Sequence, residues 1–514
     1  MEISQLEPRA VFRFFEEISQ IPRPSYQERA ISDYLAAFAE RRGLFCQQDA
    51  LGNIIIIKDA SAGYEEEPPI ILQGHMDMVC EREPDCVKNM ETEGLDLFVE
   101  GDFVKARGTT LGGDDGIAVA YALAILDAED IPHPRLEFVC TVCEEVGMEG
   151  ATALDVSCLK GRRLLNLDSE EERSFLAGCA GGCTAQITLP AETLAVEGEN
   201  VGSVGGRNDK ETGSLVTLEI SGLVGGHSGT EIDKGHANAN RLMAELLQEL
   251  FARQPFELVY LEGGSKDNAI PRSCTCILET DRGEALAKLA ERKAAVIRER
   301  WIAAEPQICF SVTVQPAEGT DACRTNDRHS RVEERATGKL LQALAAFPNG
   351  VIAMCSEPEG LVETSLNLGV MQLLPEGLTL RYSVRSCVDR ELEALIGRLE
   401  TLAKNAGGTL EISGKYPAWE YRKHSPFREK LTAIYREMFG VTPPVDIIHA
   451  GLECGILAAK LPELECVSMG PDILDIHTPK ERMCISSVQR MYRYLLRVLK
   501  EREKSCPTEE TQAN

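Results

Sequence analysis

The chain has 514 residues and carries 82 acidic side chains against 54 Lys and Arg, which gives a formal net charge of -28. A single hydrophobic core rarely grows beyond about 250–300 residues, so this length predicts at least two domains. The excess of negative charge argues against binding to nucleic acid or to an anionic membrane surface, because like charges repel.

The 18 cysteines are predicted to be reduced thiols in a cytoplasmic protein. The N-terminal residues lack a basic start followed by an apolar run, and no stretch of about 18 apolar residues occurs. Cys140 and Cys143 form a C-x-x-C, but they lie in an apolar run and have no second pair with which to bind zinc. We therefore interpret them as buried thiols of a strand and expect no redox function, since no C-x-x-C begins a helix.

Helices and short apolar strands alternate over the first third of the sequence. Apolar residues at helical spacing predict helices, and β-branched apolar runs predict buried strands. The expected elements are helices over 11–21 and 28–43, strands over 53–59 and 68–75, a helix over 115–130, and strands over 136–147 and 162–170. This alternation predicts a mostly parallel sheet with helices on both faces.

The character of the sequence changes near Cys183. The elements expected beyond it are strands over 184–192, 214–226, 256–265, 274–280 and 378–387, and helices over 236–253, 285–304 and 391–407. The polar, glycine-rich stretch Val196–Gly213 is predicted to be a loop. Helices over 426–440 and 486–502 return to the first pattern. We therefore predict an α/β domain made of residues 1–183 and 413–514, into which an α+β domain of residues 184–412 is inserted.

Five segments place metal-binding side chains at the ends of apolar runs, where sites form in open α/β sheets. They contain His75 and Asp77, Asp114 and Asp115, Glu144 and Glu145, Asp168, and His477. Each residue alone has a structural interpretation, such as a helix cap for Asp114 or a solvated strand end for Glu144. Two histidines with several carboxylates are, however, the ligand types that zinc, manganese and cobalt prefer. Together they predict a metal site.

The order of several longer motifs makes a family resemblance specific. These motifs are GHMDMV, GTTLGGDDGIA, CEEVGMEGA, LLNLDSEE, GGHSG, GGSKDNAIPR, VETSLNLGV, IHAGLECG and IHTPKE. With them, over nearly its whole length, the chain resembles the aminoacyl-histidine dipeptidases, also called Xaa-His or cytosol non-specific dipeptidases, of the di-zinc exopeptidase family. The resemblance implies a catalytic domain with a mixed, mostly parallel sheet flanked by helices. It also implies an inserted lid domain through which two chains form a homodimer.

The resemblance further implies two divalent metal ions, zinc in the first instance, with manganese or cobalt as alternatives. His75 and Asp168 would bind one ion. Glu145 and His477 would bind the other. Asp114 would bridge the two.

Three residues correspond to those that assist catalysis in the family. Asp77 would hold the ring of His75 in its ligating tautomer. Glu144 would act as the general base that takes a proton from the attacking water and returns it to the leaving amine. His227, in GGHSG, would stabilise the oxyanion from the inserted domain, in that family often the domain of the second subunit. By itself His227 is a loop histidine among glycines.

Four residues are candidates for binding the substrate. Arg385 offers a bidentate fork to a C-terminal carboxylate, although it also fits a surface strand. Asn268 would contribute from the lid, or order a turn before a proline. His449 and Glu453, in IHAGLECG, match the part of the family that shapes the substrate pocket, and Glu453 would meet the free amino group of a dipeptide.

The expected substrates are dipeptides of the Xaa-His type, with β-alanyl-histidine and Cys-Gly as further possibilities. A tripeptidase or a deacylase of N-acyl amino acids, from the same clan, is the alternative enzyme. The length of the insert and the motifs VETSLNLGV and IHAGLECG favour the dipeptidase. A non-catalytic binding relative is a further alternative, which the presence of all five ligands and of Glu144 disfavours.

Overall fold

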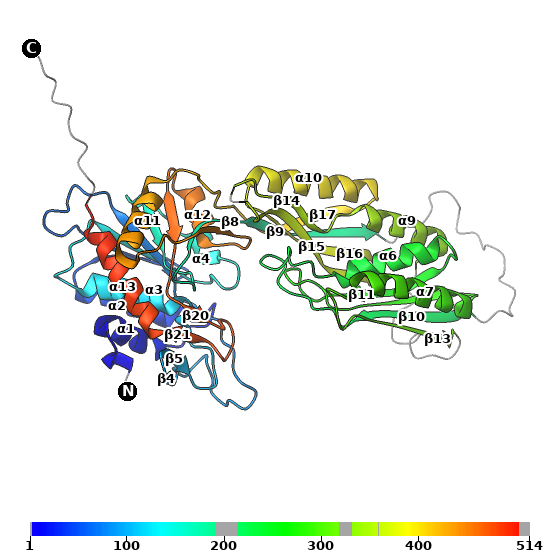
Figure 1. The fold of residues 1–514 in the computed structure, drawn as a ribbon, viewed down its shortest axis with the longest axis horizontal. Coiled ribbons are helices and arrows are strands. Elements are labelled where there is room, and N and C mark those ends of the chain that lie inside the picture. The colour runs from blue at the N-terminus through cyan, green and yellow to red at the C-terminus, as the bar shows by residue number, and fades with distance from the viewer. Residues whose placement is uncertain (1–2, 191–212, 318–331, 358, 503–514) are drawn as a thin grey trace, which may run out of the picture. The chain divides into compact units, whose positions relative to one another are not determined.

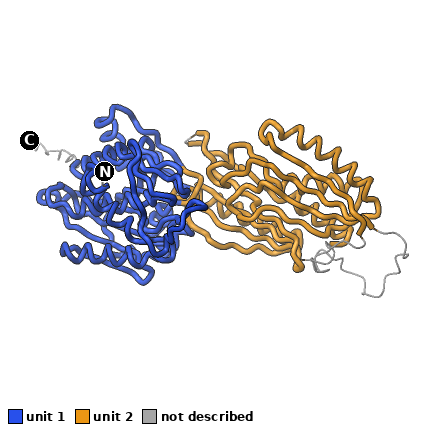
Figure 2. The backbone as a smooth tube through the Cα atoms, turned by 90° about the horizontal axis from the view of Figure 1, so that it is seen from below, with its two compact units in different colours: residues 1–179, 421–447, 452–514 blue, residues 180–420, 448–451 orange. Residues whose placement is uncertain are grey.

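The computed structural model describes residues 3–190, 213–317, 332–357 and 359–502. The chain divides into two compact units, drawn in different colours in Figure 2. Unit 1 comprises residues 1–179, 421–447 and 452–514, and unit 2 comprises residues 180–420 and 448–451. Most of the loop predicted over Val196–Gly213, residues 196–212, lies outside the described residues.

The unit boundaries differ from those that we predicted after Cys183 and after Ile412. The structure places them after Cys179 and after Glu420. The physical reason is that strands β9 (Gly181–Pro190) and β17 (Thr409–Tyr416) pair with each other, so both belong to the sheet of unit 2. A sequence pattern marks a change of character, but it does not show which strands become neighbours.

An eight-stranded sheet lies at the centre of unit 1, in the order β1-β2-β6-β3-β7-β19-β8-β18. Its strands are β1 (Phe45–Gln48), β2 (Ile54–Lys58), β3 (Ile70–His75), β6 (Leu136–Thr141), β7 (Arg163–Asn166), β8 (Phe175–Cys179), β18 (Val445–Ile448) and β19 (Glu465–Ser468). Strands β6, β3, β7 and β19 are parallel neighbours, whereas β1, β2 and β8 pair antiparallel. The parallel strands end at one edge of the sheet, which gathers the residues that follow them.

Helices cover both faces of this sheet, as predicted. The helices of unit 1 are the short 3-10 helix η1 (Ile3–Gln5), α1 (Arg9–Ser19), α2 (Arg29–Arg41), α3 (Gly113–Asp127), α4 (Glu149–Ala153), α11 (Pro426–Phe439), α12 (Glu453–Lys460) and α13 (Ile485–Lys500) (Figure 1). Alternate residues of a strand point to opposite faces. In β2, Ile54 and Ile56 join the main core, while Ile55 and Ile57 are buried outside it.

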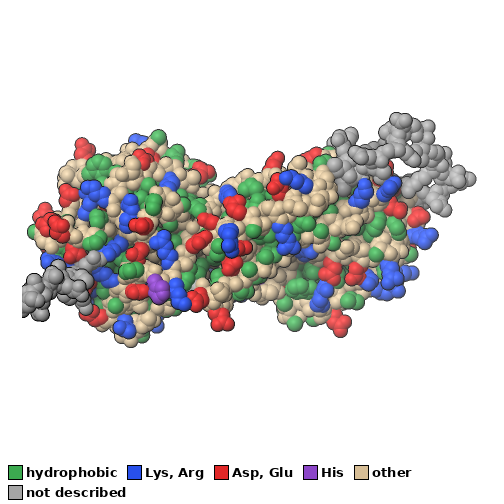
Figure 3. Space-filling view, turned by 90° about the horizontal axis from the view of Figure 1, so that it is seen from above, with side chains coloured by type: hydrophobic (Ala, Val, Ile, Leu, Met, Phe, Trp, Pro, Cys, Tyr) green, Lys and Arg blue, Asp and Glu red, His purple; other side chains and the backbone are tan. Residues whose placement is uncertain are grey.

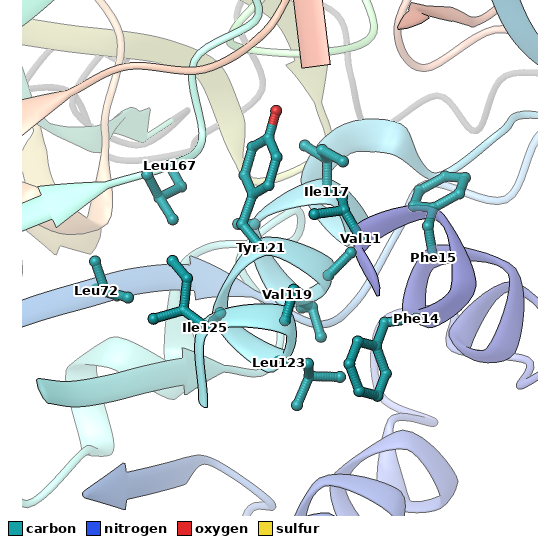
Figure 4. Packing of buried hydrophobic residues seen from close by; sticks show 14 of the residues in the cluster. Val11, Phe14, Phe15, Leu72, Ile117, Val119, Tyr121, Leu123, Ile125 and Leu167 are labelled. Atoms are coloured by element: carbon teal, nitrogen blue, oxygen red, sulfur yellow. The ribbon is translucent and has the colours of Figure 1, made fainter. Parts of the chain in front are cut away.

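Helix α3 is buried on every side, which explains why residues 117–126 form one almost wholly apolar run. Figure 4 shows Tyr121, Leu123 and Ile125 of this helix among side chains of α1 and of the sheet. The hydroxyl of Tyr121 donates to the carbonyl of Val488 in α13 at 3.0 Å. This packing fixes the position of the helix and therefore of its first residues, which include Asp114.

A four-stranded sheet in unit 1 was not predicted. It has the order β20-β21-β5-β4, with β4 (Leu97–Glu100), β5 (Phe103–Ala106), β20 (Ile473–Leu474) and β21 (Arg482–Cys484). Two of its strands come from near residue 100 and two from near the C-terminus, so no local sequence pattern predicts this sheet. The sheet holds both ends of the loop that carries His477.

Unit 2 is built on a second sheet of nine strands, in the order β13-β10-β12-β11-β15-β16-β9-β17, with β14 paired to β15. Besides β9 and β17, its strands are β10 (Ser214–Ser221), β11 (Glu257–Gly263), β12 (Cys274–Thr280), β13 (Cys309–Pro316), β14 (Gly350–Met354), β15 (Val362–Leu374) and β16 (Gly377–Ser386). Its helices are α6 (Ala239–Phe251), α7 (Gly283–Trp301), α9 (Glu334–Ala346) and α10 (Asp389–Asn405). The predicted class, α/β with an inserted α+β domain, is confirmed.

The surface carries mixed charge. On the face drawn in Figure 3, acidic and basic side chains are interspersed, with hydrophobic side chains between them. Among the described residues, no helix is both long enough and apolar enough to cross a membrane. Cys140 and Cys143 are buried free thiols, as predicted.

Candidate metal centre

Two groups of potential metal ligands lie in unit 1 and share one residue, Asp114. The first group contains His75, Asp114 and Asp168, and the second contains Asp114, Glu145 and His477. Within each group the ligand atoms lie within 4.8 Å of one another. The structure thus brings together the five side chains that the sequence analysis selected.

The sheet positions three of these ligands through neighbouring parallel strands. His75 is the last residue of β3, Asp168 follows the end of β7, and Glu145 follows the end of β6. Asp114 lies at the start of α3, and His477 lies in the loop between β20 and β21. The centre therefore forms at the carboxyl ends of the parallel strands, where loops from distant parts of the chain converge.

The distances between ligand atoms fit a pair of divalent ions. Nε2 of His75 lies 3.1 Å from Oδ1 of Asp114 and 3.3 Å from Oδ1 of Asp168. Nε2 of His477 lies 3.0 Å from Oδ2 of Asp114 and 3.1 Å from Oε1 of Glu145. Ligand atoms at about 2.0–2.1 Å from a tetrahedral zinc ion lie about 3.3 Å apart. Asp114 presents a different oxygen to each histidine, as a bridging carboxylate does.

The charges around these ligands favour a cation. Burial raises the pKa of Asp168 to about 6, and the neighbouring carboxylates of Asp114 and Glu145 contribute, although His75 opposes them. Hydrogen bonds to Asp114 and Glu145 raise the pKa of His477 to about 11. Burial thus favours the protonated form of Asp168, and the neighbouring carboxylates favour the cationic form of His477. A divalent ion would supply the same positive charge, so the donor set fits such an ion.

Asp77 connects the first ligand group to the turn that carries Glu144 and Glu145. Its Oδ1 lies 3.3 Å from Nδ1 of His75. It also accepts hydrogen bonds from the backbone N–H groups of Glu144, at 3.1 Å, and Glu145, at 3.3 Å. Burial would raise the pKa of Asp77, but the hydrogen bond and charge of His75 lower it below its usual value. An ionised Asp77 holds the His75 ring so that Nε2 faces the other ligands.

Ser25 is a contributor that sequence reasoning missed. Its hydroxyl donates to Oδ2 of Asp77 at 2.8 Å. A lone serine in a proline-containing loop gives no local signal of this contact. Its partner lies 52 residues further along the chain, so only the folded structure shows the pair.

Glu144 lies in a turn and not in a strand, which corrects the prediction of a strand over 136–147. Strand β6 ends at Thr141, and residues 144–147 form the turn. Cys143, directly before the turn, has a φ of +54°, and its N–H donates to Oε1 of Glu28 at 2.9 Å. Because the chain turns here, Glu144 and Glu145 are not forced to opposite faces, as they would be on a strand.

The Glu144 carboxyl lies in the electrostatic field of the first ligand group. Burial raises the pKa of Glu144 well above its ordinary value, and Asp168, Glu453 and Glu145 add to this effect while His75 opposes it. A carboxylate with a raised pKa accepts and returns a proton more readily near neutral pH. Glu144 belongs to neither ligand group.

Glu453 is completely buried beneath the strand ends. Its Oε2 accepts hydrogen bonds from Nε2 of Gln73 at 2.5 Å and from the Thr141 hydroxyl at 2.6 Å. Its Oε1 has no hydrogen-bond partner among the described residues. Burial raises the pKa of Glu453 to about 8. A buried oxygen without a partner is costly, and a ligand that donates a hydrogen bond would satisfy it.

In unit 2, three of the predicted residues lie close to one another. His449 and His227 both lie beside Gly229. A Cβ atom at that glycine would be 2.4 Å from the backbone carbonyl oxygen of His449 and 2.9 Å from the ring of His227. Burial and the charge of Arg385 lower the pKa of His227, and they lower that of His449 to about 4. Both histidines are therefore neutral near pH 7. Arg385 is buried and donates to the hydroxyl of Tyr416 at 2.9 Å.

The tautomer of His227 follows from its neighbours. The backbone N–H of Thr230 donates to Nδ1 of the ring at 3.2 Å. A neutral ring whose Nδ1 accepts carries its proton on Nε2. His227 therefore offers an Nε2–H donor.

Asn268 and His449 have different surroundings within unit 2. Asn268 is exposed. Its backbone carbonyl accepts a hydrogen bond from the N–H of Ser228 at 2.9 Å, and this bond joins the loop of Asn268 to the loop of His227. His449 is buried, with Nε2 at 2.8 Å from the Ser365 hydroxyl. The backbone, and not the side chain, thus connects Asn268 to the loop of His227.

Comparison with known proteins gives one consistent family. A model of the peptidase family M20/M25/M40 matches residues 71–501. The cytosol non-specific dipeptidase of Escherichia coli is 35% identical over 97% of this chain and 99% of its own length. The structure of aminoacylhistidine dipeptidase from Vibrio alginolyticus matches with a TM-score of 0.84 and 32% identity, over 98% of this chain and 99% of its own. These matches confirm the resemblance that the motifs indicated.

A more distant structure shares the fold alone. Aminopeptidase PepT from Bacillus cereus matches with a TM-score of 0.52 and 15% identity, over 96% of this chain and 98% of its own.

Proposed function

Because the chain belongs to the peptidase family M20/M25/M40, we propose that it is a metallopeptidase that hydrolyses dipeptides, in particular those with a C-terminal histidine. The observation that carries the proposal is the pair of ligand groups that share Asp114, with Glu144 beside them. Two divalent ions fit these groups, with zinc as the first candidate and manganese or cobalt as alternatives. The Escherichia coli and Vibrio alginolyticus relatives are both dipeptidases by name, which supports the choice of dipeptides.

The roles that we propose for the side chains of unit 1 follow from their contacts. Two bound ions would lower the pKa of a water molecule and polarise the peptide carbonyl. Glu144 takes the proton of the attacking water and returns it to the amine that leaves. Asp77 keeps the ring of His75 in one orientation throughout, because its own hydrogen bonds to Ser25 and to the turn hold it in place.

The residues of unit 2 have chemistry that suits substrate binding. We propose that the Nε2–H of His227 donates to the oxyanion that develops on the carbonyl. The guanidinium of Arg385 suits the substrate's C-terminal carboxylate, because Arg can form two parallel hydrogen bonds with it. His449 and Asn268 would complete the surface that binds the C-terminal residue. The shared location of His227, Arg385 and His449 supports this assignment.

We also propose that the protein acts in the cytoplasm as a homodimer formed through unit 2. The word "cytosol" in the name of the Escherichia coli relative supports the location. Strand β13 supports the dimer, because it lies at the edge of the sheet and pairs with β10 alone among the described strands. An edge of this kind can accept a strand from a second chain.

The proposed function is tested by hydrolysis of a small panel of substrates. The panel contains Ala-His, β-Ala-His, Cys-Gly, a tripeptide and an N-acetyl amino acid. We expect chelated protein to cleave none of them, and protein re-supplied with zinc, manganese or cobalt to cleave the dipeptides fastest. Fastest cleavage of the tripeptide or the acyl amino acid would keep the metal centre and replace the substrate. Metal binding without cleavage of any compound would refute a peptidase function.

A second test concerns the free amino group of the substrate and Glu453. We expect the substrate's ammonium group to bind Glu453 in its ionised form, which the glutamine of Glu453→Gln cannot adopt, and a hydrogen bond to a charged group contributes about 1.5–3 kcal/mol. Since each 1.4 kcal/mol is a factor of about ten, we expect KM for Ala-His to rise about tenfold or more. The change in kcat should be smaller. Steady-state kinetics of the zinc enzyme measure both constants.

Glu137→Gln is the matched control for that experiment. Glu137 is also a completely buried carboxylate of unit 1, and it accepts hydrogen bonds from Lys160, Gly161 and Arg135. It shares the burial of Glu453 but contacts no proposed ligand. We expect its KM to equal that of the wild type. An unchanged KM in Glu453→Gln would remove Glu453 from the substrate site and leave it a structural role.

A further inference from the structure

The carboxylate of Glu481 binds the backbone turn that precedes Asp114. Oε2 of Glu481 accepts hydrogen bonds from the N–H groups of Leu111, at 2.7 Å, and Gly112, at 3.0 Å. Oε1 accepts from the N–H of Gly113 at 2.8 Å and lies 3.4 Å from the N of Asp114. Glu481 is 2% exposed. One carboxylate thus binds consecutive amides of the turn that leads into α3, and the last of these belongs to Asp114.

A buried arginine binds the same turn through its carbonyl side. Nη2 of Arg23 donates to the carbonyl of Gly112 at 2.6 Å. Nη1 of Arg23 donates to the carbonyls of Met76, at 3.0 Å, and Asp77, at 3.1 Å. Arg23 is 1% exposed. The turn is therefore fixed by an anion on its amides and by a cation on its carbonyl.

These contacts account for the two glycines in the sequence LGGDD. A side chain at Gly112 would meet Nη2 of Arg23 at 2.6 Å, and one at Gly113 would meet Oε1 of Glu481 at 3.2 Å. Gly112 also has a φ of +62°, which favours glycine. The backbone must come this close to both charged groups for the hydrogen bonds to form.

Glu481 also belongs to the loop that carries His477, four residues earlier in the chain. This loop contains two residues other than glycine with positive φ, Asp475 at +55° and His477 itself at +58°. The side chain of His477 is 45% exposed, against 1% for His75, so packing alone does not hold it. A conformation of this kind persists where surrounding contacts enforce it.

We propose that Glu481 is a positioning residue that holds the His477 loop and the Asp114 turn in one fixed relation. Through it, Nε2 of His477 and Oδ2 of Asp114 stay 3.0 Å apart, ready to bind the same ion. This role rests on the function proposed above, because Glu481 can position metal ligands only if the two groups bind metal ions. Its chemistry is that of a carboxylate that orders backbone amides and never touches the metal.

The two ion sites depend on Glu481 to different degrees. The second group has two of its three ligands, Asp114 and His477, on the two segments that Glu481 joins. In the first group, His75 is the last residue of β3 and Asp168 follows β7, and these two strands pair directly with each other. Loss of Glu481 should therefore weaken ion binding at the second group much more than ion binding at the first group.

The experiment measures metal affinity in the full-length chain. We expect Glu481→Gln to bind Co²⁺ or Zn²⁺ at the second ligand group about 10–100-fold more weakly than the wild type. In glutamine one carboxylate oxygen is replaced by an NH2 group, which repels the backbone N–H groups. Affinity for the first ion should change by less than threefold. At limiting metal, kcat for Ala-His should fall with the occupancy of the second ion, with KM nearly unchanged. Excess metal should restore kcat, which it would not do for a variant that is merely unstable.

Glu137→Gln again serves as the matched control. Glu137 binds the backbone N–H groups of Lys160 and Gly161 and so performs the same kind of contact on a loop without ligands. We expect it to lower the melting temperature in the way that Glu481→Gln does, while both ions bind as in the wild type. Equal affinity for both ions in Glu481→Gln and wild type would overturn the inference. If the wild type bound no metal at all, the proposed function itself would fail, which is a separate and distinguishable result.

Discussion

Replacement of Glu144 by glutamine is expected to lower kcat for dipeptide hydrolysis by about 10²–10⁴-fold, the usual contribution of a general base. Glutamine has nearly the same shape as glutamate, but its amide cannot take a proton from water. The backbone N–H of residue 144 can still donate to Asp77, so the turn should keep its conformation. Steady-state kinetics on Ala-His with the zinc-loaded protein measure the loss.

The metal content of the same variant separates loss of the base from loss of the site. Glu144 belongs to neither ligand group, so Glu144→Gln should retain two ions per chain. Glu149→Gln is a suitable control, because Glu149 is an exposed carboxylate at the start of α4, close in sequence and outside both groups. Its kcat should match the wild type. Retention of more than about a tenth of wild-type kcat in Glu144→Gln would assign the proton transfer to another group.

Replacement of Asp114 by asparagine is expected to disturb both ions at once. One carboxylate oxygen faces His75 and the other faces His477, and an amide can offer an oxygen to only one of these sites. Two-metal activation contributes several kcal/mol to the transition state. Since each 1.4 kcal/mol is a factor of ten, activity should fall by about 10³-fold or more. Metal analysis after dialysis should find fewer than two ions per chain, with weaker binding of both.

Asp168→Asn provides the comparison that identifies Asp114 as the shared ligand. Asp168 belongs only to the first group. Its replacement should therefore weaken the binding of one ion and leave the other ion with all of its ligands. Isothermal titration of each variant with zinc distinguishes the two patterns. If Asp114→Asn and Asp168→Asn each weakened the binding of only one ion, Asp114 would not be the bridge. In that case the two groups would function as independent sites.

The five ligands could be identified from the sequence because each has a local signal. His75 and Asp168 lie at the ends of apolar runs that favour buried strands, and Asp114 precedes an apolar helix. The parallel arrangement of such strands brings the residues that follow them to one edge. The assignment of each ligand to an ion came from the family motifs and not from these signals. The structure adds that the two oxygens of Asp114 face different histidines.

Elements whose partners are distant in sequence escaped prediction. Strand β15 (Val362–Leu374) contains Thr364, Ser365 and Asn367, and its sequence was recognised as a motif and not as a strand. It is nevertheless buried, because β16 pairs along it for ten positions. The strand predicted to continue to residue 147 ends instead at Thr141, because contacts of Cys143 with Glu28 turn the chain. In each case a neighbour outside the local segment decided the conformation.

The sequence by itself determined the class of fold, the membership of a peptidase family, and the ligand types that gather at the strand ends. These properties depend on hydrophobic periodicity and on ordered motifs, which act over a few residues. Only the tertiary structure decided that Asp77 holds the turn of Glu144, and that Glu481 binds the amides before Asp114 across 370 residues of sequence. The burial and partners of a polar side chain are set by segments that meet only when the chain folds, so no local pattern records them.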